Sequence, residues 1–535
     1  MLDQPTVDVR PEMTAHRPGD EVALLVDTSR STTGSVTVTH LGTHTLTAVV
    51  KLDTGRTRIP LGPLDVGSYA VRLVTASGQA TTAFDVLDDP IARPRYGFLA
   101  DFRPGRDDAL AVADSLRAFH LNVVQLYDWM YRHAELAPPA DEFEDALGRP
   151  LSLASVRSML DTVHEVGALA LGYATVYGAG EEYAAAHPYQ VLHRRGGTAW
   201  MLADFLWVMD VSAGSEWSRH IVGQMVEAVR DVGFDGLHLD QYGDPKVALT
   251  TSGAVVDLAD AFPAFIDAVR AALPEATLIF NNVNDFPTRR TVLANQNATY
   301  IEVWPPHDDY ADLVRLVDVA RDLAPHRPVI LAAYLTPFAT AGGEHELATA
   351  KLALATVWAA GGQYLLLGET HGILVDPYYP RFATLAAVAV RILRAFADFA
   401  VANGDLLFDP AAGESSGSWA LGIHDQVVVT GARTSTRPQA GSVWVRTSSA
   451  GRRLVVQLVD YRDQAGARWN ATREPTQPVT GLTVTLPAVS DKPTVWFGTP
   501  AAGPDLVPLS VSDNPDLVVV EIPAFDTWAL LLVDC

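Results

Sequence analysis

Two acidic residues stand at the ends of short apolar segments of the chain. Asp240 lies in GLHLDQYG (236–243) and Glu302 lies in TYIEVWP (299–305). If these segments are neighbouring parallel strands, both carboxylates lie at the same edge of a sheet, and such a pair could cleave a glycosidic bond. That chemistry needs one ionised and one protonated carboxyl group, which close placement and partial burial can arrange. Asp240, short and held at a strand end, is the better nucleophile, and Glu302, longer and beside Trp304, is the better proton donor.

Each carboxylate alone also has an ordinary structural explanation. An Asp at the end of a barrel strand often caps a helix or pairs with an Arg, and Glu302 alone is no more diagnostic. The two together, with aromatic residues around them, favour the catalytic interpretation. Their separation stays open at this point: about 5–5.5 Å would give retention, and about 6.5–9.5 Å would give inversion.

The other residues near the expected strand ends suit a sugar. Aromatic faces stack on the C–H surface of a pyranose, while carboxylates, amides and imidazoles hydrogen-bond its hydroxyl groups. Phosphate would instead require Arg, Lys or glycine amides, and the strand ends offer none. The candidate substrate-binding residues are Asp101, Tyr127, Asp128, Tyr131, Tyr173, Tyr177, His238, Asn282, Trp304, Tyr334 and Glu369. Tyr242 and Asn281 also stand at strand ends.

A metal site is the alternative use of the Asp240 strand. His238 and Asp240 are two residues apart, so their side chains point to the same side of a strand and could hold a metal ion. No second His pair stands at a strand end. We therefore expect neither a metal nor another cofactor.

The middle of the chain predicts a (β/α)₈ barrel, the TIM-barrel fold, over residues 93–400. Helix candidates lie at 107–119, 153–166, 215–232, 255–272, 309–323, 344–360 and 380–398, with an irregular excursion over 178–215. The strand candidates are 96–102, 122–129, 168–177, 236–243, 277–283, 299–305, 328–335 and 363–369. A doubly wound open sheet is the alternative, but no glycine-rich dinucleotide turn follows the first strand.

The two ends of the chain predict β domains on either side of the barrel. Residues 1–92 alternate in Thr and Val between turns, as in 21–26, 34–40 and 69–74, which favours an immunoglobulin-like β-sandwich. The prolines of 88–95 place the first boundary. Residues 401–535 return to strands and favour an antiparallel β-sandwich. Its expected strands are 418–423, 426–430, 453–459 and 527–532.

The bulk composition limits the partners. Lys plus Arg total 39 against 63 Asp plus Glu, and the resulting charge of −24 repels phosphate backbones and anionic lipid, so we expect no nucleic-acid and no membrane partner. Cys535 is the only cysteine, which excludes an intrachain disulfide. The N-terminus has no secretory signal, and no apolar run approaches about 18 residues. These features predict a cytoplasmic protein, unless a leader was trimmed before Met1.

Four segments resemble glycoside hydrolase family 66, the dextranases and cycloisomaltooligosaccharide glucanotransferases. They are LYDWMYRH (126–133), GFDGLHLDQYGDP (233–245), YIEVW (300–304) and LLLGETHGILVDPYYP (365–380). The resemblance implies a retaining enzyme acting on α-1,6-glucan, by a double displacement. It implies that Asp240 is the nucleophile and that Glu302 is the acid and then the base.

Two other activities remain open beside hydrolysis. A transglycosylase would resolve the intermediate with a sugar hydroxyl, and a non-catalytic carbohydrate-binding protein would keep the groove without turnover. The cyclising members of the family carry a carbohydrate-binding insertion after the seventh strand, where this chain has only the short loop 336–343. Hydrolysis of dextran or isomalto-oligosaccharides is therefore favoured, with the carbohydrate as the expected partner.

Overall fold

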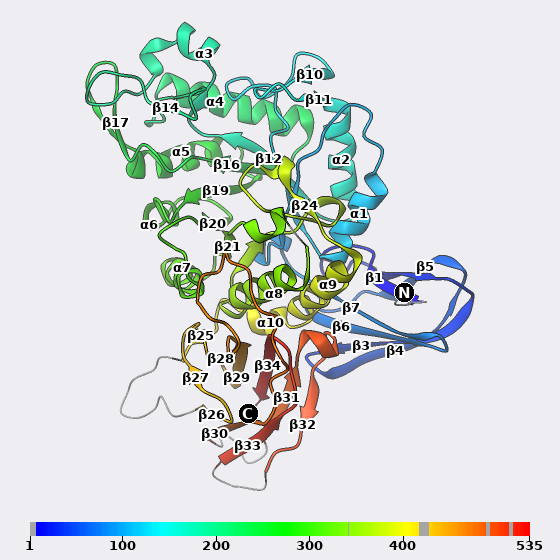
Figure 1. Ribbon diagram of the computed structural model, residues 1–535. Helices are drawn as coiled ribbons and strands as arrows, with labels where there is room; N and C mark the ends of the chain where they lie inside the picture. The colour runs from blue at the N-terminus through cyan, green and yellow to red at the C-terminus, as the bar shows by residue number, and fades with distance from the viewer. Residues whose placement is uncertain (1–6, 341, 417–426, 488–492, 513–516, 535) are drawn as a thin grey trace.

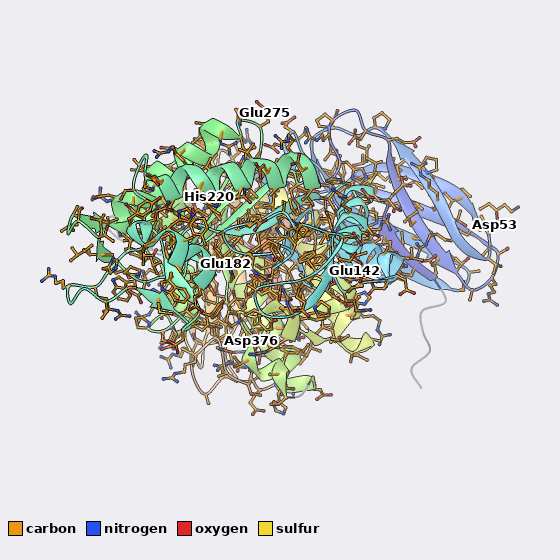
Figure 2. The ribbon with its side chains drawn as sticks, turned by 90° about the horizontal axis from the view of Figure 1, so that it is seen from above. Asp53, Glu142, Glu182, His220, Glu275 and Asp376 are labelled. Carbon is orange, nitrogen blue, oxygen red and sulfur yellow. The ribbon has the colours of Figure 1, made fainter. Side chains whose placement is uncertain are left out.

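A computed structural model describes residues 7–340, 342–416, 427–487, 493–512 and 517–534 of the chain. A central sheet surrounded by helices is accompanied by two groups of β-strands, one from each end of the sequence, which lie next to each other beside the helices (Figure 1). The Thr39 hydroxyl of the first group donates to Asp505 Oδ1 of the second at 2.7 Å. Figure 2 views the molecule from above, with the N-terminal strands to one side of the helices and Asp53 at their far end.

The N-terminal strands form two sheets. β1 (Val7–Pro11), β2 (Val22–Thr28) and β5 (Gly55–Gly62) form one sheet, and β4 (Thr43–Leu52), β3 (Thr32–His40), β6 (Gly67–Thr75) and β7 (Gly78–Val86) form the other. All paired strands within these two sheets are antiparallel. The three segments expected at 21–26, 34–40 and 69–74 are confirmed as strands.

The two N-terminal sheets share one hydrophobic core. It includes Val9 and Leu24 from one sheet and Val36 and Phe84 from the other. Along β3 the buried residues alternate with more exposed ones, as expected for a strand with one face on a core. The immunoglobulin-like type and the boundary at residue 92 stay predictions.

The middle of the chain forms an eight-stranded parallel sheet that is close to a closed barrel. Neighbouring strands are parallel throughout, in the order β22-β21-β20-β19-β16-β12-β9-β8, and β22 contacts β8 across the remaining gap. The strands are β8 (Tyr96–Leu99), β9 (Val123–Leu126), β12 (Leu169–Thr175), β16 (Gly236–Asp240), β19 (Thr277–Val283), β20 (Ala298–Glu302), β21 (Val329–Ala332) and β22 (Gln363–Leu365). All eight expected strands are confirmed, and most end earlier than expected because their last residues leave the ladder for the loops.

Side chains of the barrel strands alternate between the interior and the helix layer. Tyr300 belongs to the interior cluster, whereas Ile301 packs among the helices. On β16, Leu237 and Leu239 likewise pack outward, so His238 and Asp240 point inward. This alternation decides which residues at the strand ends point into the barrel interior and which point to the helices.

Helices cover the outside of the barrel. They are α1 (Ala109–Ala118), α2 (Leu153–Glu165), α4 (Glu216–Glu227), α5 (Leu258–Ala272), α7 (Tyr310–Leu323), α8 (Glu344–Ala359) and α9 (Ala387–Ala402). Side chains cap several of them: the Ser152 hydroxyl accepts from the Ser155 N–H, and Asp257 accepts from the Ala259 N–H. The seven expected helices are confirmed, and a π-helical turn (Ala228–Val232) continues α4 to the end that we expected.

The expected start of the last helix at residue 380 is wrong. The chain forms a 3₁₀ turn at Tyr379–Arg381 and a short strand, β24 (Ala383–Thr384), before α9 begins. β24 pairs with β23 (Gly372–Ile373), and this pairing uses backbone groups that a helix would need for its own hydrogen bonds.

The connections between the main elements contain further short helices and strands. The excursion that we expected to be irregular contains α3 (Glu181–Ala186) and a sheet of β13 (Gly178–Ala179), β15 (Leu206–Val208) and β14 (Met201–Leu202). Two hairpins are β10 (Glu142–Glu144) with β11 (Pro150–Ser152), and β17 (Val247–Leu249) with β18 (Val255–Asp257). Two further short helices are α6 (Thr288–Thr291) and α10 (Gly404–Leu407).

The C-terminal strands also form two sheets around one core. The larger sheet contains β25 (Gly413–Glu414), β28 (Val443–Ala450), β29 (Arg453–Asp460), β34 (Trp528–Asp534), β31 (Thr494–Gly498) and β32 (Val507–Leu509), with β27 (Thr434–Ser435) beside β28. The smaller contains β26 (Val428–Thr430), β30 (Leu482–Pro487) and β33 (Leu517–Ile522). Both contribute to one hydrophobic cluster that includes Leu458 and Val484.

Three of the four strands expected in this region are confirmed, as β26, β29 and β34. The strand expected at 418–423 lies outside the described residues. The larger sheet is not antiparallel throughout, because β27 pairs with β28 in parallel. The sandwich type and the boundary at residue 400 stay predictions. Within the described ranges, no helix is long and apolar enough to cross a membrane.

Candidate active site

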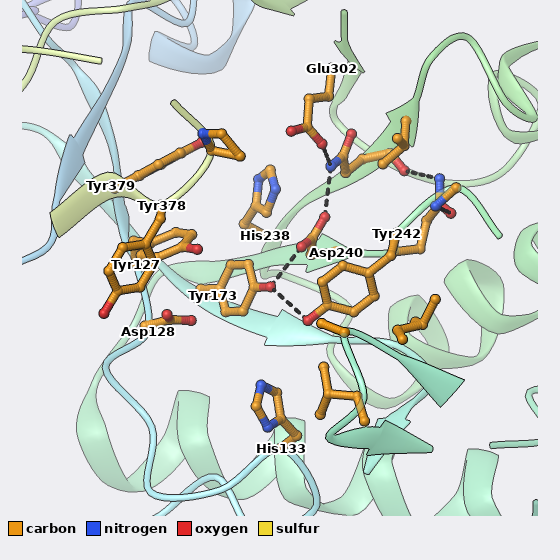
Figure 3. Close-up of a pocket in the computed structure, with 18 of the residues that line it drawn as sticks. Tyr127, Asp128, His133, Tyr173, His238, Asp240, Tyr242, Glu302, Tyr378 and Tyr379 are labelled. Carbon is orange, nitrogen blue, oxygen red and sulfur yellow. Dashed lines mark hydrogen bonds between the residues drawn. The ribbon is translucent and has the colours of Figure 1, made fainter. Parts of the chain in front are cut away.

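A cavity of about 770 Å³ opens at the carboxyl ends of the barrel strands. Its lining is rich in aromatic rings and carboxylates that come from several of the strands and the loops after them (Figure 3). The central residues are Tyr127, Asp128, Tyr173, His238, Asp240, Tyr242, Asn281, Glu302, Trp304, Tyr334, Tyr378 and Tyr379. The cavity therefore gathers residues that are far apart in the sequence.

Asp240 and Glu302 face each other across one side chain. The Asn281 amide nitrogen donates to Asp240 Oδ1 at 2.6 Å and to Glu302 Oε2 at 2.9 Å (Figure 3). These two distances together limit the separation of the two carboxylate oxygens to at most 5.5 Å. An amide NH₂ group has two hydrogens, so it can bond both acids at once.

Burial raises the pKa of both acids. The pKa of Asp240 rises to about 6 because burial outweighs the hydrogen bonds from Tyr173 and Asn281, which favour the ionised form. The pKa of Glu302 rises to about 7, because burial acts together with the nearby charge of Asp240. The pair is thus arranged so that Asp240 loses its proton first and Glu302 keeps its proton to higher pH.

A layer of rings surrounds Asp240. The Tyr173 hydroxyl donates to Asp240 Oδ2 at 2.6 Å and lies 3.3 Å from the hydroxyl of Tyr242. The His238 ring lies nearly parallel to that of Tyr173, at 13°, and its Nδ1 is 3.0 Å from the Tyr96 hydroxyl. Burial lowers the pKa of His238 to about 3, so this imidazole is neutral at ordinary pH.

Asp128 supplies a third carboxylate to the cavity. Its backbone is in the left-handed region, with φ at 49°. Burial raises its pKa to about 7, although Arg149, whose guanidinium lies 3.7 Å from its Oδ2, acts in the opposite direction. Arg149 also donates to the Asp128 carbonyl at 2.9 Å, which fixes this turn.

Aromatic rings line the wall beside Asp128. Tyr127 and Tyr379 are stacked with ring centroids 4.2 Å apart, and Tyr378 contacts the Tyr127 ring edge-on at 6.4 Å. On the side of Glu302, Trp304 contacts Tyr334, whose hydroxyl donates to Glu302 Oε1 at 3.0 Å. These rings form much of the cavity wall around the two acids.

Comparison with known proteins identifies the family. The family model of glycosyl hydrolase family 66 matches residues 13–532, which is nearly the whole chain. The chain belongs to glycosyl hydrolase family 66. The resemblance expected from the four sequence segments is thereby confirmed.

The relatives of this family 66 chain are named for two different activities, glucan transfer and dextran cleavage. A cycloisomaltooligosaccharide glucanotransferase of Niallia circulans is 27% identical over 316 residues, which cover 54% of this chain and 32% of the relative. A dextranase of Streptococcus salivarius is 23% identical over 389 residues, which cover 60% of this chain and 47% of the relative. The matched regions are thus less than half the length of these relatives.

Solved structures agree with the fold. A Paenibacillus sp. cycloisomaltooligosaccharide glucanotransferase, complexed with cycloisomaltoheptaose, superposes with a TM-score of 0.88 at 18% identity, over 98% of this chain and 100% of that chain. An α-amylase of Geobacillus thermoleovorans gives a TM-score of 0.53 at 11% identity, over 83% of this chain and 99% of that chain. At these identities the likeness concerns the fold alone.

The structure brings eight of the expected site residues of this family 66 chain into the cavity. They are the acids Asp240 and Glu302 together with Tyr127, Asp128, Tyr173, His238, Trp304 and Tyr334. Their contact with a substrate stays a prediction. Among the described residues, no group of three or more His, Cys, Asp or Glu side chains is placed to hold a metal ion.

Three other expected site residues lie outside the cavity lining because of the strand alternation and the local turns. Asn282 points to the helix layer, where its amide donates to the Tyr300 carbonyl at 2.8 Å. Asp101 follows the inward residue Ala100 and accepts from the Arg103 N–H at 3.1 Å. Tyr131 packs against Phe143 instead.

Tyr177 and Glu369 are also outside the lining and support it from behind. The Tyr177 hydroxyl donates to the Asp244 carbonyl at 2.7 Å and accepts from the Tyr242 N–H at 2.9 Å, which fixes the loop after Asp240. Glu369 accepts from the Ala100 N–H at 2.6 Å and pairs with the buried Arg106. Both side chains therefore bond to neighbouring protein groups behind the cavity lining.

Several lining residues are not among the candidate site residues chosen from the sequence. Asn281 and Tyr242 are recognised at strand ends but not chosen, and only the inward direction of Asn281 separates it from Asn282. Tyr379 belongs to the turn that we expected to be helical, and Tyr378 precedes it. Loop residues such as His133 and Phe205 also reach the cavity. His133 ends the segment LYDWMYRH that resembles the family, whereas no local pattern in the sequence marks Phe205.

Proposed function

We propose that this protein is a retaining glycoside hydrolase that cleaves α-1,6-glucosidic linkages in dextran or isomalto-oligosaccharides. Asp240 is the nucleophile, and Glu302 is the general acid and then the general base. The observation that carries the proposal is the Asn281 bridge, which holds Asp240 Oδ1 and Glu302 Oε2 no more than 5.5 Å apart. That spacing supports double displacement, since an inverting pair needs about 6.5–9.5 Å to admit a water molecule.

The pKa order of the two acids supports the assignment of their roles. In the first step, ionised Asp240 attacks the anomeric carbon while Glu302 gives its proton to the leaving oxygen. A glycosyl ester of Asp240 forms, and the leaving sugar departs with its new hydroxyl. In the second step, Glu302 takes a proton from water, which attacks the same carbon and releases Asp240.

The lining supports a neutral sugar as substrate. Tyr127, Tyr173 and Trp304 offer aromatic faces, and Asp128 and His238 offer hydrogen-bonding groups. The α-1,6-glucan assignment rests on the names of the relatives, a dextranase and cycloisomaltooligosaccharide glucanotransferases. Lining residues lie on both sides of the acid pair, which favours attack within a chain over removal of its last unit (Figure 3).

Product analysis tests the proposal. The protein is incubated with dextran and with short isomalto-oligosaccharides, and the anomer released first is followed by NMR. Oligosaccharides that appear first as the α-anomer would support retaining hydrolysis. Release of the β-anomer first would contradict the mechanism, and no release from either substrate would contradict the assigned activity.

A glucanotransferase is the second candidate. The names of two relatives favour it, because both are cycloisomaltooligosaccharide glucanotransferases. The chemistry differs only in the second step, where a sugar hydroxyl replaces water. Chromatography at high substrate concentration separates the two, since a transferase yields longer or cyclic products and a hydrolase yields shorter linear ones.

A further inference from the structure

One short segment of the C-terminal region contacts two loops of the barrel. Residues 467–470 lie between β29 and β30, in a connection that leaves the C-terminal sheets. In Figure 1 the orange chain of this region rises from those sheets toward α7, α8 and β21. We call residues 467–470 the clamp segment.

The first loop that the clamp segment contacts follows β20, the strand of Glu302. The Trp469 indole N–H donates to the His307 carbonyl at 2.7 Å, and the Trp469 backbone N–H donates to the Asp308 carbonyl at 3.0 Å. The Tyr310 N–H donates back to the Ala467 carbonyl at 2.9 Å. These hydrogen bonds join the clamp segment to residues 307–310.

The second loop follows β21, the strand before Tyr334. Asn470 Oδ1 accepts from both the N–H and the hydroxyl of Thr336, each at 3.0 Å. The next residue, Ala471, accepts at its carbonyl from the Thr349 hydroxyl at 3.2 Å. The same short stretch of chain is therefore bonded to the loops after two consecutive strands of the barrel.

These two loops follow side chains that line the cavity around Glu302. Tyr334 stands two residues before Thr336, and its hydroxyl donates to Glu302 Oε1. Trp304 stands three residues before His307, lines the same cavity and contacts the ring of Tyr334. A shift of either loop would therefore move Tyr334, either directly or through the Trp304 ring that contacts it.

The clamp segment has a fixed shape of its own. The Arg473 guanidinium donates to the Gly466 carbonyl at 2.7 Å and to the Arg468 carbonyl, and Arg473 is itself buried. Trp469 is only 4% exposed, so its ring is packed as well as hydrogen-bonded. A segment held in this way can resist movement of the loops that it contacts.

We propose that the clamp segment is a positioning element for Glu302, through which the C-terminal region takes part in the acid step. Trp469 and Asn470 are its positioning residues, and they act through Trp304 and Tyr334. The inference rests on the proposed function, in which Glu302 protonates the leaving oxygen. It assigns to the C-terminal region a role in catalysis rather than in stability alone.

Three variants of the 535-residue chain test the proposal. Trp469→Phe keeps an aromatic ring and removes the indole donor to His307. Asn470→Ala removes the acceptor for Thr336 at an exposed position, and Asn470→Asp keeps an acceptor there. The matched control is Trp444→Phe, which makes the same change at a buried tryptophan of β28 whose indole donates to the Thr436 carbonyl at 3.3 Å.

Two substrates distinguish a specific loss of the acid step from a loss of activity caused by misfolding or a distorted site. α-Isomaltotriosyl fluoride needs no proton for departure of fluoride, whereas an isomalto-oligosaccharide needs the proton of Glu302. We expect kcat/KM on the oligosaccharide to fall about tenfold in Trp469→Phe and Asn470→Ala, with kcat/KM on the fluoride within about twofold of the parent protein. Asn470→Asp restores the oligosaccharide rate, and Trp444→Phe changes neither rate.

Hydrogen exchange followed by mass spectrometry tests the clamp without any substrate. We expect exchange about fivefold faster around Tyr310 in Trp469→Phe and around Thr336 in Asn470→Ala, and no change there in Trp444→Phe. Unchanged exchange in both loops would show that the clamp segment does not hold them. An equal fall of kcat/KM on both substrates, or no fall on either, would show that the clamp segment has no role in the acid step.

The same measurements distinguish failure of the proposed function. If the parent protein acts on neither substrate, the α-1,6-glucosidase assignment fails, and the role in the acid step fails with it. Hydrogen exchange then still decides whether residues 467–470 hold the two loops, and unchanged exchange overturns the positioning element in that case too.

Discussion

Asp240 and Glu302 accept hydrogen bonds from the same amide nitrogen, at 2.6 and 2.9 Å. The bridging nitrogen belongs to Asn281 on β19, the strand that lies between the strands of the two acids in the sheet. The distance between the acids is therefore set by a side chain of the strand that separates them. A change at this one amide affects both carboxyl groups at once.

The pH profile of kcat/KM is expected to be bell-shaped. In the proposed mechanism Asp240 acts in its ionised form, and burial raises its pKa to about 6, so we expect activity to fall below that pH. In the same mechanism Glu302 acts in its protonated form, and burial beside Asp240 raises its pKa to about 7, so we expect activity to fall above that pH. The two limbs describe the pair rather than single residues. A profile that keeps rising far above the pKa of Glu302 would contradict the assignment of Glu302 as the acid.

Removal of the bridging amide is expected to move this profile to higher pH. The Asn281 hydrogen bonds favour the ionised form of both acids and so lower both pKa values. In Asn281→Ala both limbs therefore shift upward, with a loss of about 10- to 100-fold in kcat/KM at the original optimum. Asn295→Ala, an exposed position after the same strand, is the control. Limbs that stay in place would show that the bridge does not set the pKa values.

Azide rescue is expected to separate the roles of the two acids. Replacement of either acid by a small residue lowers kcat by at least about 10³-fold. With a good leaving group, azide takes the place of the missing carboxylate in Asp240→Gly and gives the β-glycosyl azide. In Glu302→Ala the Asp240 ester still forms, and azide releases it as the α-glycosyl azide. NMR of the glycosyl azides identifies which acid is the nucleophile. If Asp240→Gly gave the α-azide and Glu302→Ala gave the β-azide, the two roles would have to be exchanged.

Glu369→Gln is expected to lower stability rather than substrate affinity. Glu369 pairs with Arg106, and the side chains of both are only 1% exposed, so the variant leaves a buried cation with Asp108 as its remaining carboxylate partner among the described residues. The loss is about 3 kcal/mol of unfolding free energy, with KM unchanged. Denaturant unfolding and steady-state kinetics check this, with Glu275→Gln on the surface as the control. A raised KM at unchanged stability would instead support the original prediction that Glu369 binds substrate.

The sequence alone was sufficient for the main elements and for the acid pair. The apolar segments around Leu239 and Ile301 end in carboxylates, and the repeated strand and helix patterns follow from local hydrophobic periodicity. The start of α9 was missed because the pairing of β24 with β23 overrides the local helical pattern, and such pairing is not visible in a short stretch of sequence.

Only the tertiary structure decided which residues at the strand ends meet. Asn281 and Asn282 are chemically identical neighbours, and the direction of β19 in the barrel sends one to the acids and the other to the helices. Glu369 carries the same functional group as Glu302, yet it pairs with the buried Arg106 outside the cavity lining, whereas Glu302 belongs to that lining. The sequence determines the residue types at the strand ends and the positions of the strands along the chain, because both are local properties. The 5.5 Å limit between Asp240 and Glu302, and the contact of Trp469 with the loop beyond Glu302, depend on barrel closure and on packing between segments that are distant in the chain.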